Sequence, residues 1–350
     1  MILNQKSFRK TLENAKNFID KKNKTTNGIW IANNTATATN FEIYYKELLN
    51  NLDSNEEQKK PIFLDKETIK KIIDYIKKSK LKEIKLSADN EDIFINDTPL
   101  NKVTVNPEEM PSLLKEELMD RKGIYNVKKY KLSNKLLESV RTIFSKDSLL
   151  TEDIKEGFNN YKYATFIQLI NDKATWTNGY VMHIIYTNLS DINVFIPIEL
   201  FLKYKKFTEE FTLSHYNYTD EKDREIMTVT LDNGTISITY RLALGTIKHP
   251  TYDQMAKIIN GAISLSKPIE YEKEELLKEA NLSKRNNGKE KINQATTIKL
   301  KAETDLNFIY LNFILSFFTN KVKIYSDNNK YNPVVFEVEK ERIITIMPLK

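Results

Sequence analysis

Paired carboxylates and histidines are the residues of this sequence whose types could serve acid–base or metal chemistry. The adjacent carboxylate pairs are Glu108/Glu109, Glu209/Glu210 and Glu274/Glu275. Adjacent side chains point about 100° apart on a helix, so such pairs are more often a solvated face than two facing catalytic groups. The three histidines are widely separated, at His183, His215 and His249. We therefore predict no catalytic residue, no metal site and no cofactor.

Nucleophilic and phosphate-loop motifs give no further candidate. The chain has no cysteine, which excludes thiolate nucleophiles, disulfides and cysteine metal sites. Gly288-Lys289 lacks the upstream glycine and the following Ser or Thr that a phosphate-binding loop needs. The sequence therefore favours a protein that binds its partners over one that catalyses a reaction.

Lysine and arginine side chains along predicted helices are the candidate binding groups of this sequence, because their positive charges can bind phosphates. We expect DNA contacts from Lys6, Arg9, Lys10, Lys70, Lys77, Lys135, Arg141, Lys203 and Lys206. Cations spread along helices attract phosphates without reading bases, which suits non-specific binding of double-stranded DNA. An ordinary solvated helix face is the alternative for any single lysine, because the net charge is only +6, from 54 basic and 48 acidic residues.

The elements that must position these cations form a faint threefold repeat. Each unit begins with a predicted helix, and a second helix follows an apolar strand. The segments that contain these elements are 5–22, 65–80, 131–146, 193–207, 271–285 and 306–320. The helix over 65–80 places Ile69, Ile72, Ile73 and Ile76 on one face, at the spacing of an amphipathic helix. Asp232-Asn233-Gly234, between two alternating apolar segments, is a strong hairpin-turn signal.

This repeat predicts an α+β fold of three tandem domains, each with two helices packed on antiparallel sheet. The expected domains are 1–125, 126–250 and a shortened 251–350. A parallel βαβ arrangement is the alternative, but short strand–turn–strand pairs favour hairpins. The richest apolar segment, 306–318, is interrupted by polar residues, so we expect no membrane span. The first ten residues lack an apolar signal core, so we expect a cytoplasmic protein.

Four local segments resemble the bacterial DNA polymerase III beta subunit, the β sliding clamp. The C-terminal IITIMPLK is similar to the closing strand and Met-Pro tail of that family, and KVKIYSDNNKYNPVVF is similar to the strand–turn–strand before it. TNGYVMHI, from Thr177, resembles the family's threonine-aspartate-glycine-histidine-arginine-leucine segment, and HPTYDQM, from His249, resembles its domain junction. The resemblance extends over the whole chain.

The resemblance implies a non-enzymatic DNA sliding clamp: a head-to-tail homodimer that closes as a ring around duplex DNA and tethers DNA polymerase and the clamp loader. Such partners bind through short peptide motifs in an apolar pocket. The pocket residues carried over are Thr177, Gly179, Tyr180, Val181, Met182, Pro250, Met255, Pro333, Met347, Pro348 and Leu349. For the dimer interface we expect an edge strand at Val103–Val105.

The sequence departs from the family in the pocket segments. Asn178, Tyr180 and Val181 replace an aspartate, a histidine and an arginine, and His249 and Gln254 replace a phenylalanine and an arginine. One alternative is therefore a clamp-like decoy, or a mobile-element paralogue, that binds clamp partners without forming a normal ring. Another, from a different class, is an α+β nuclease or hydrolase.

Overall fold

The structure is a computed structural model. It describes residues 1–20, 22–50, 52, 60–111, 127–144, 165–179, 181–204, 207–247, 249–278, 297–299, 305–307, 314–315, 317, 320–326, 332–338 and 342–346. These residues fall into two compact units, 1–134 with 203–245 and 135–202 with 246–350. Each unit is built around one large antiparallel sheet.

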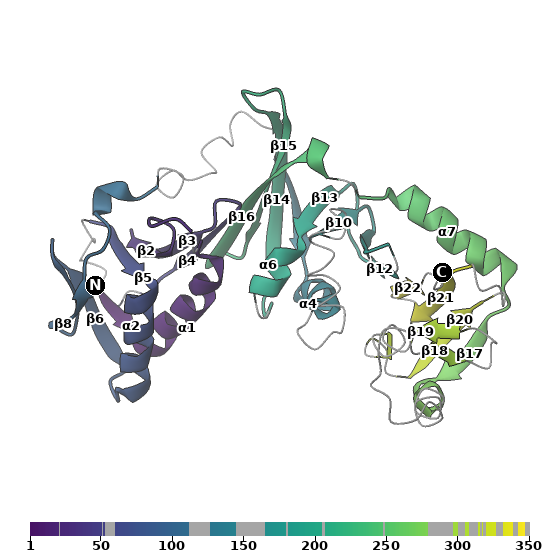
Figure 1. The fold of residues 1–350 in the computed structure, drawn as a ribbon, viewed down its shortest axis with the longest axis horizontal. Helices are drawn as coiled ribbons and strands as arrows, with labels where there is room; N and C mark the ends of the chain where they lie inside the picture. The colour runs from purple at the N-terminus through teal and green to yellow at the C-terminus, as the bar shows by residue number, and fades with distance from the viewer. Residues whose placement is uncertain are drawn as a thin grey trace. The chain divides into compact units, whose positions relative to one another are not determined.

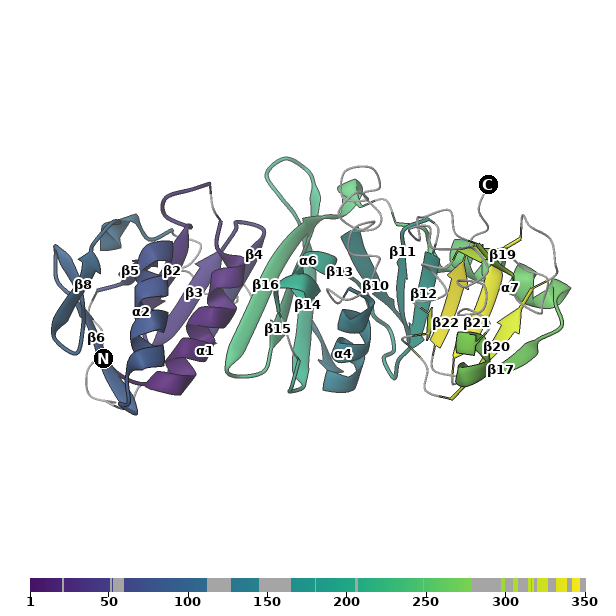
Figure 2. The ribbon, with the colours of Figure 1, turned by 60° about the horizontal axis from the view of Figure 1, so that its bottom comes forward.

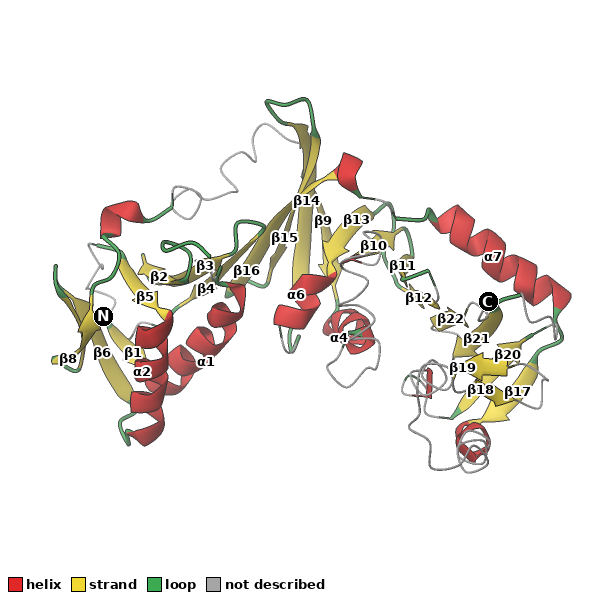
Figure 3. Ribbon diagram, in the orientation of Figure 1, coloured by secondary structure: helices red, strands yellow, loops and turns green. Residues whose placement is uncertain are grey.

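The first unit contains an eight-stranded sheet. Its order is β5 (Ile62–Asp65), β2 (Gly28–Ala32), β3 (Thr35–Thr39), β4 (Ile43–Leu48), β16 (Ile236–Ala243), β15 (Glu225–Asp232), β14 (Phe211–Thr219) and β9 (Lys128–Leu132) (Figure 1; β9 is labelled in Figure 3). The central junction joins distant sequence, because β4 pairs with β16 from Ile43↔Tyr240 to Glu47↔Ile236. A further sheet has the order β1 (Ile2–Asn4), β6 (Glu83–Ala88), β7 (Asp92–Ile95) and β8 (Thr98–Lys102).

Two amphipathic helices of the first unit pack side by side (Figure 3). Helix α1 (Gln5–Ala15) begins at the Asn4 cap, whose side chain accepts the Ser7 N–H, and buries Phe8 and Leu12. Helix α2 (Lys66–Lys78) is capped by Asp65 and buries the four isoleucines of the predicted face, Ile69, Ile72, Ile73 and Ile76. Both predicted helices are therefore confirmed but are shorter than predicted: α1 ends at Ala15 and is followed by a 3-10 turn over Lys16–Phe18, and α2 ends at Lys78.

The second unit contains another eight-stranded antiparallel sheet (Figure 2). Its order is β13 (Asn193–Pro197), β10 (Phe166–Ile170), β11 (Lys173–Thr177), β12 (Val181–Tyr186), β22 (Arg342–Ile346), β21 (Val334–Val338), β20 (Lys321–Tyr325) and β17 (Ile269–Glu272). Strands β18 (Thr297–Lys299) and β19 (Asp305–Asn307) pair separately. The helices are α4 (Asn134–Ile143), α6 (Ile198–Lys203) and α7 (Tyr252–Leu265). The first residue of α4, Asn134, and the last of α6, Lys203, are assigned to the first unit.

The predicted α+β class with antiparallel strands is confirmed, and so is the hairpin turn between β15 and β16. There Gly234 has a φ of +84°, which glycine adopts without strain, and its N–H donates to the Asp232 carboxylate. The segment 126–250 contributes strands to both large sheets, so the two units do not follow the expected boundaries near 125 and 250. The division into three domains stays a prediction.

Candidate functional site

Exposed lysines on α1 and α2 are the best-placed of the predicted DNA contacts. Lys6 and Lys10 are one turn apart on α1, and Lys70 and Lys77 are two turns apart on α2; all four are exposed. The spacing follows from the amphipathic pattern, which buries the opposite face of each helix. Lys135, in the first turn of α4, is also exposed. The exposed ammonium groups on α1 and α2 are accessible to a polyanion.

Three other predicted contacts are engaged within the protein. The Arg9 guanidinium lies 3.0 Å from Glu13 Oε1, and that of Arg141 lies 2.7 Å from Glu138 Oε2. The Lys203 ammonium lies 5.9 Å from the centre of the Phe18 ring, a cation–π contact on a partly buried side chain. Lys206 lies outside the described residues. A phosphate would therefore compete with internal partners at Arg9, Arg141 and Lys203.

The turn between β11 and β12 forms the first part of the predicted peptide pocket. The Thr177 hydroxyl accepts the Gly179 N–H at 3.0 Å, and the Asn178 side chain accepts the Val181 N–H at 2.8 Å. Gly179 has a φ of +89°, which suits glycine. Asn178 thus supplies the turn hydrogen bond that an aspartate could also make. Val181 and Met182 are buried, and Tyr180 lies outside the described residues.

Strand register brings three predicted pocket segments to one end of the second sheet. Val181 at the start of β12 pairs with Ile346 at the end of β22, and Ile346 also pairs with Val334 at the start of β21. Pro333 directly precedes Val334, and the predicted tail residues Met347, Pro348 and Leu349 directly follow Ile346, outside the described residues. The chain therefore brings Val181 and Ile346, far apart in the sequence, together at one candidate site.

Helix α7, which was not predicted as a helix, carries the pocket residue Met255 and begins directly after Pro250 and the Thr251 cap. Its capping box joins Thr251 and Gln254, and it packs Ile259 and Ala262 against Ile184 and Val335. Met255 is buried in the same helix face, whereas Pro250 is partly exposed just before the cap. Thr251-x-x-Gln254 followed by apolar residues at i, i+4 and i+7 was the available signal.

A lysine missed by the sequence analysis anchors the first turn of α7. The Lys173 ammonium lies 4.9 Å from the ring centre of Tyr252 and 5.8 Å from that of Tyr186. Lys173 also ion-pairs with Asp172, which lowers the pKa of that carboxyl. Lys173 and Thr177 stand at opposite ends of β11, about 13 Å apart at the rise of a strand. Tyr252 is therefore held at the end of β11 opposite the Thr177 turn.

The predicted edge strand at Val103–Val105 is displaced in the structure. The edge strand of its sheet is β8, which ends at Lys102, and Val105 is buried with Trp30, Phe63 and Met110 in the core. Val105 is 2% exposed, because the segment after β8 packs against Trp30 of β2 and Phe63 of β5 in the eight-stranded sheet. The outward-facing edge is β8, and Val103 directly follows it.

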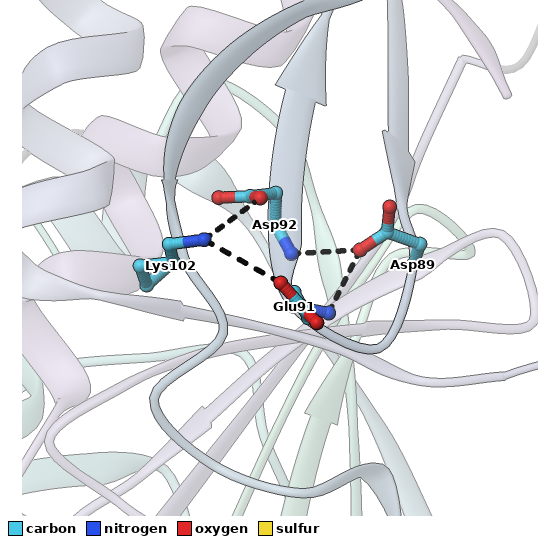
Figure 4. Close-up of polar contacts among 4 residues, drawn as sticks. All are labelled: Asp89, Glu91, Asp92 and Lys102. Carbon is cyan, nitrogen blue, oxygen red and sulfur yellow. Dashed lines mark hydrogen bonds and ion pairs between the residues drawn. The ribbon is translucent and has the colours of Figure 1, made fainter.

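Three acidic residues, Asp89, Glu91 and Asp92, lie in and beside the β6–β7 turn next to this edge, together with Lys102 (Figure 4). The Asp89 carboxylate accepts the N–H groups of Glu91 and Asp92 at 2.8 and 2.7 Å, which lowers the pKa of Asp89. The Lys102 ammonium lies 3.0 Å from Asp92 and 3.8 Å from Glu91. The arrangement is a turn with a neutralising lysine. Among the described residues, no group of three or more His, Asp or Glu side chains is placed to hold a metal.

Comparisons with known proteins find this fold in solved sliding clamps. No family model matches the sequence. No curated protein matches it either. The structure is similar over 100% of this chain to the DNA polymerase III beta subunit of Thermotoga maritima, covering 98% of that chain at a TM-score of 0.69 and 14% identity. It is likewise similar to the Helicobacter pylori beta clamp bound to a DNA ligase peptide (99% covered, TM-score 0.69, 14% identity).

The sliding clamp of Pseudomonas aeruginosa, solved with a ligand, gives a TM-score of 0.70 at 12% identity, over 100% of this chain and 99% of that one. No described helix of this chain has the length and apolar character to cross a membrane. The chain therefore has the fold of the DNA polymerase III beta subunit, the sliding clamp, over its full length.

Proposed function

We propose that this protein is a DNA sliding clamp, which encircles duplex DNA and tethers a polymerase to it without catalysing a reaction. The observation that carries the proposal is the similarity of fold to solved clamps over the whole chain, at TM-scores of 0.69 and 0.70. The identity of 12–14% is too low to transfer a function by itself. The proposal therefore depends on the sites that the chain presents.

Non-specific attraction to the DNA backbone is supported by the exposed lysines of α1, α2 and α4. Lys6, Lys10, Lys70, Lys77 and Lys135 lie on regular helices and are exposed to solvent. Lysine binds phosphate as a point charge and imposes little geometry. Such contacts give affinity for any sequence and permit sliding.

Tethering is proposed to occur at the end of the second sheet where β12, β21 and β22 meet. Buried Val181 and Met182 lie there beside the chain that leads to Pro333 and to Met347–Leu349. Methionine side chains adapt to varied apolar partners, and short peptide motifs anchor through a few large side chains. We propose that the peptide motifs of the polymerase and the clamp loader bind at this end.

The second candidate is a clamp-like decoy that does not close a ring, and the β8 edge favours it. Pro99 in β8 has no N–H, and the β7–β8 register shifts between Ile93 and Phe94. Lys102 adds a charge to the same strand. Prolines, irregular register and lysines on an edge strand all disfavour pairing with another strand. A homodimer joined through β8 must accommodate these features.

Assembly and DNA retention distinguish the two candidates. Light scattering across micromolar concentrations should give twice the 41.0 kDa chain mass for a ring-forming dimer. A dimer added to nicked circular plasmid with a clamp loader and ATP should remain bound in high salt and leave when the plasmid is linearised. A monomer at every concentration that still binds a polymerase-derived peptide would favour the decoy. Retention unchanged by linearisation would contradict encirclement.

A peptide titration tests the proposed tethering site. Deleting Met347–Lys350 should weaken a fluorescent polymerase-derived peptide about tenfold or more, because one buried Leu or Phe anchor contributes about 1.5–3 kcal/mol. Light scattering on both forms checks that the assembly state is unchanged. Equal affinity for the two forms would contradict this location of the pocket.

A further inference from the structure

The face of the first sheet opposite α1 carries a row of polar and aromatic side chains that the clamp function leaves unused. Strand register places Tyr216, Thr228 and Arg241 in one row across β14, β15 and β16. Directly paired residues point to the same face of a sheet, so the three side chains are neighbours. The core lies on the other face, where Leu213, Leu231 and Ile238 are fully buried.

Two polar groups in this row are buried without an internal hydrogen bond. Thr228 is 1% exposed, and neither its hydroxyl nor the Arg241 Nε has a hydrogen-bond partner in the described part of the chain. Buried polar groups are nearly always paired, so an unpaired hydroxyl beside an unpaired guanidinium N–H indicates an external acceptor. The rest of the Arg241 side chain is partly exposed, which leaves it an approach from solvent.

Tyrosine rings surround the pair. Tyr218 lies two residues beyond Tyr216 on β14, and the two ring centres are 6.1 Å apart with their planes at 36°. Tyr44 reaches the same face from β4, where it pairs with Thr239, two residues before Arg241. The Arg241 charge acts on Tyr44 and opposes the rise in its pKa that burial causes. The row is thus an arginine and a hydroxyl between aromatic rings from two strands.

The charge of this face favours an anion. Lys129 on β9 pairs with Ser214, so it joins the same face, and it is exposed. Asp232 lies on the same face but two rows away, paired with Thr212 and Ser237, and its carboxylate accepts the Gly234 N–H at 2.8 Å. Arginine and threonine bind phosphate oxygens, while tyrosine rings stack on bases of any sequence. An acidic peptide would use the cations but not the rings.

We propose that this sheet face binds single-stranded nucleic acid. A backbone phosphate accepts hydrogen bonds from Arg241 and Thr228, neighbouring bases stack on Tyr216 and Tyr218, and Lys129 contacts a further phosphate. A small rotation of a tyrosine ring admits the phosphate to the buried Arg241 Nε. The site lies wholly within the first unit and does not depend on ring closure, so it can be tested apart from the proposed clamp function.

Fluorescence anisotropy with a labelled single strand of about 12 nucleotides tests the site. The Arg241→Gln/Thr228→Val and Tyr216→Ala/Tyr218→Ala variants should each lose about tenfold in affinity or more, since a single base–aromatic contact is worth up to a hundredfold. The matched control, Lys82→Gln/Lys85→Gln, removes two exposed lysines just before and on β6 in the other sheet of the first unit and should stay within about twofold of wild type. Circular dichroism checks that each variant is folded.

Competition experiments separate the possible sources of binding. DNA and RNA single strands, a duplex of equal length and a polyglutamate peptide are each tested as unlabelled competitors against the labelled strand. Displacement by single strands and not by polyglutamate is the expected result. Equal displacement by polyglutamate, or an unchanged affinity in the Arg241→Gln/Thr228→Val variant, would overturn the proposal. Loss of plasmid retention in the same variant would instead bear on the clamp function.

Discussion

At the scale of single residues, Glu47 is an acid in the core of the first unit. It is 6% exposed on β4, and the fully buried Tyr45 donates its hydroxyl to the Glu47 carboxylate. Burial, and then the charge and hydrogen bond of Glu47, raise the pKa of Tyr45. Burial and the same charge raise the pKa of Tyr204. A buried carboxylate is tolerated because it has a hydroxyl donor.

Removing that donor should be costly. Tyr45→Phe leaves the Glu47 carboxylate without its hydroxyl partner, so we expect the free energy of unfolding in urea to fall by about 1–3 kcal/mol. Tyr325→Phe is the matched control: its hydroxyl lies 2.8 Å from Glu337 in a partly exposed pair, and it should cost less than about 1 kcal/mol. Equal losses in the two variants would show that burial of Glu47 does not matter.

His183 predicts a pH dependence of stability. It is 1% exposed, and burial, followed by the nearby Arg342 charge, holds its pKa well below the ordinary value of 6.5. At about pH 6, His183 therefore binds a proton in the unfolded chain but stays neutral in the folded protein. The contribution is fully present above about pH 6.5 and is lost as the pH falls below it, by up to about 1.4 kcal/mol per pH unit.

Urea unfolding at several pH values between about 7.5 and 5 measures this slope. His183→Gln should make it shallower, whatever the variant's absolute stability. His215→Gln should change the pH dependence of stability less, because His215 is only partly buried and burial is the main cause of its lowered pKa. A wild-type stability that is constant over this range would contradict the assignment.

At the scale of elements, α7 shows how a helix is stabilised by a sheet. One face, with Met255, Ile259 and Ala262, is buried, while Ile258 and Leu265 remain 40% and 66% exposed. The Thr251 hydroxyl accepts the Gln254 N–H, and the Gln254 side chain accepts the Thr251 N–H. The helix therefore has a defined beginning and a single core-facing stripe.

Two substitutions in and beside α7 should change the free energy of unfolding in opposite directions. Gly261→Ala should raise the free energy of unfolding by about 0.5–1 kcal/mol, because an added Cβ meets nothing within 4 Å and alanine favours a helix. Thr251→Ala should lower it by about 0.5–2 kcal/mol through loss of the cap. Gly28→Ala is the contrasting control, since its Cβ would lie 2.4 Å from the Leu64 carbonyl oxygen. Chemical denaturation measures all three, and destabilisation by Gly261→Ala would show that α7 is not a regular helix.

At the scale of the whole molecule, DNA affinity should come from many weak contacts. Lys70→Gln, Lys77→Gln and Lys135→Gln together should reduce the slope of log affinity against log salt by about 2.7, if each lysine neutralises one phosphate. Lys85→Gln, Lys222→Gln and Lys321→Gln remove equal charge outside the helices and are the control. Duplex titrations at several salt concentrations give both slopes. A larger change in the control would exclude the helices as the DNA-binding surface.

The sequence by itself determined the local elements and the fold class. Isoleucines at helical spacing identified α2, and Asp232-Asn233-Gly234 identified the β15–β16 hairpin, because periodicity and turn geometry are local properties. The motif at Thr177 and the C-terminal segment, within a repeat, indicated the clamp fold that the solved structures share. The predicted pocket residues and DNA contacts were proposed on the same motifs and remain to be tested.

Only the tertiary structure decided which segments meet. Pairing of β4 with β16 and of β12 with β22 joins residues far apart in sequence, and no local pattern specifies such partners. The row of Tyr216, Thr228 and Arg241 follows from register across strands, and Val105 is buried by packing against Trp30 and Phe63, which lie far earlier in the chain. Register is fixed by the sum of contacts over a whole sheet face, so it becomes visible only when the sheet is assembled.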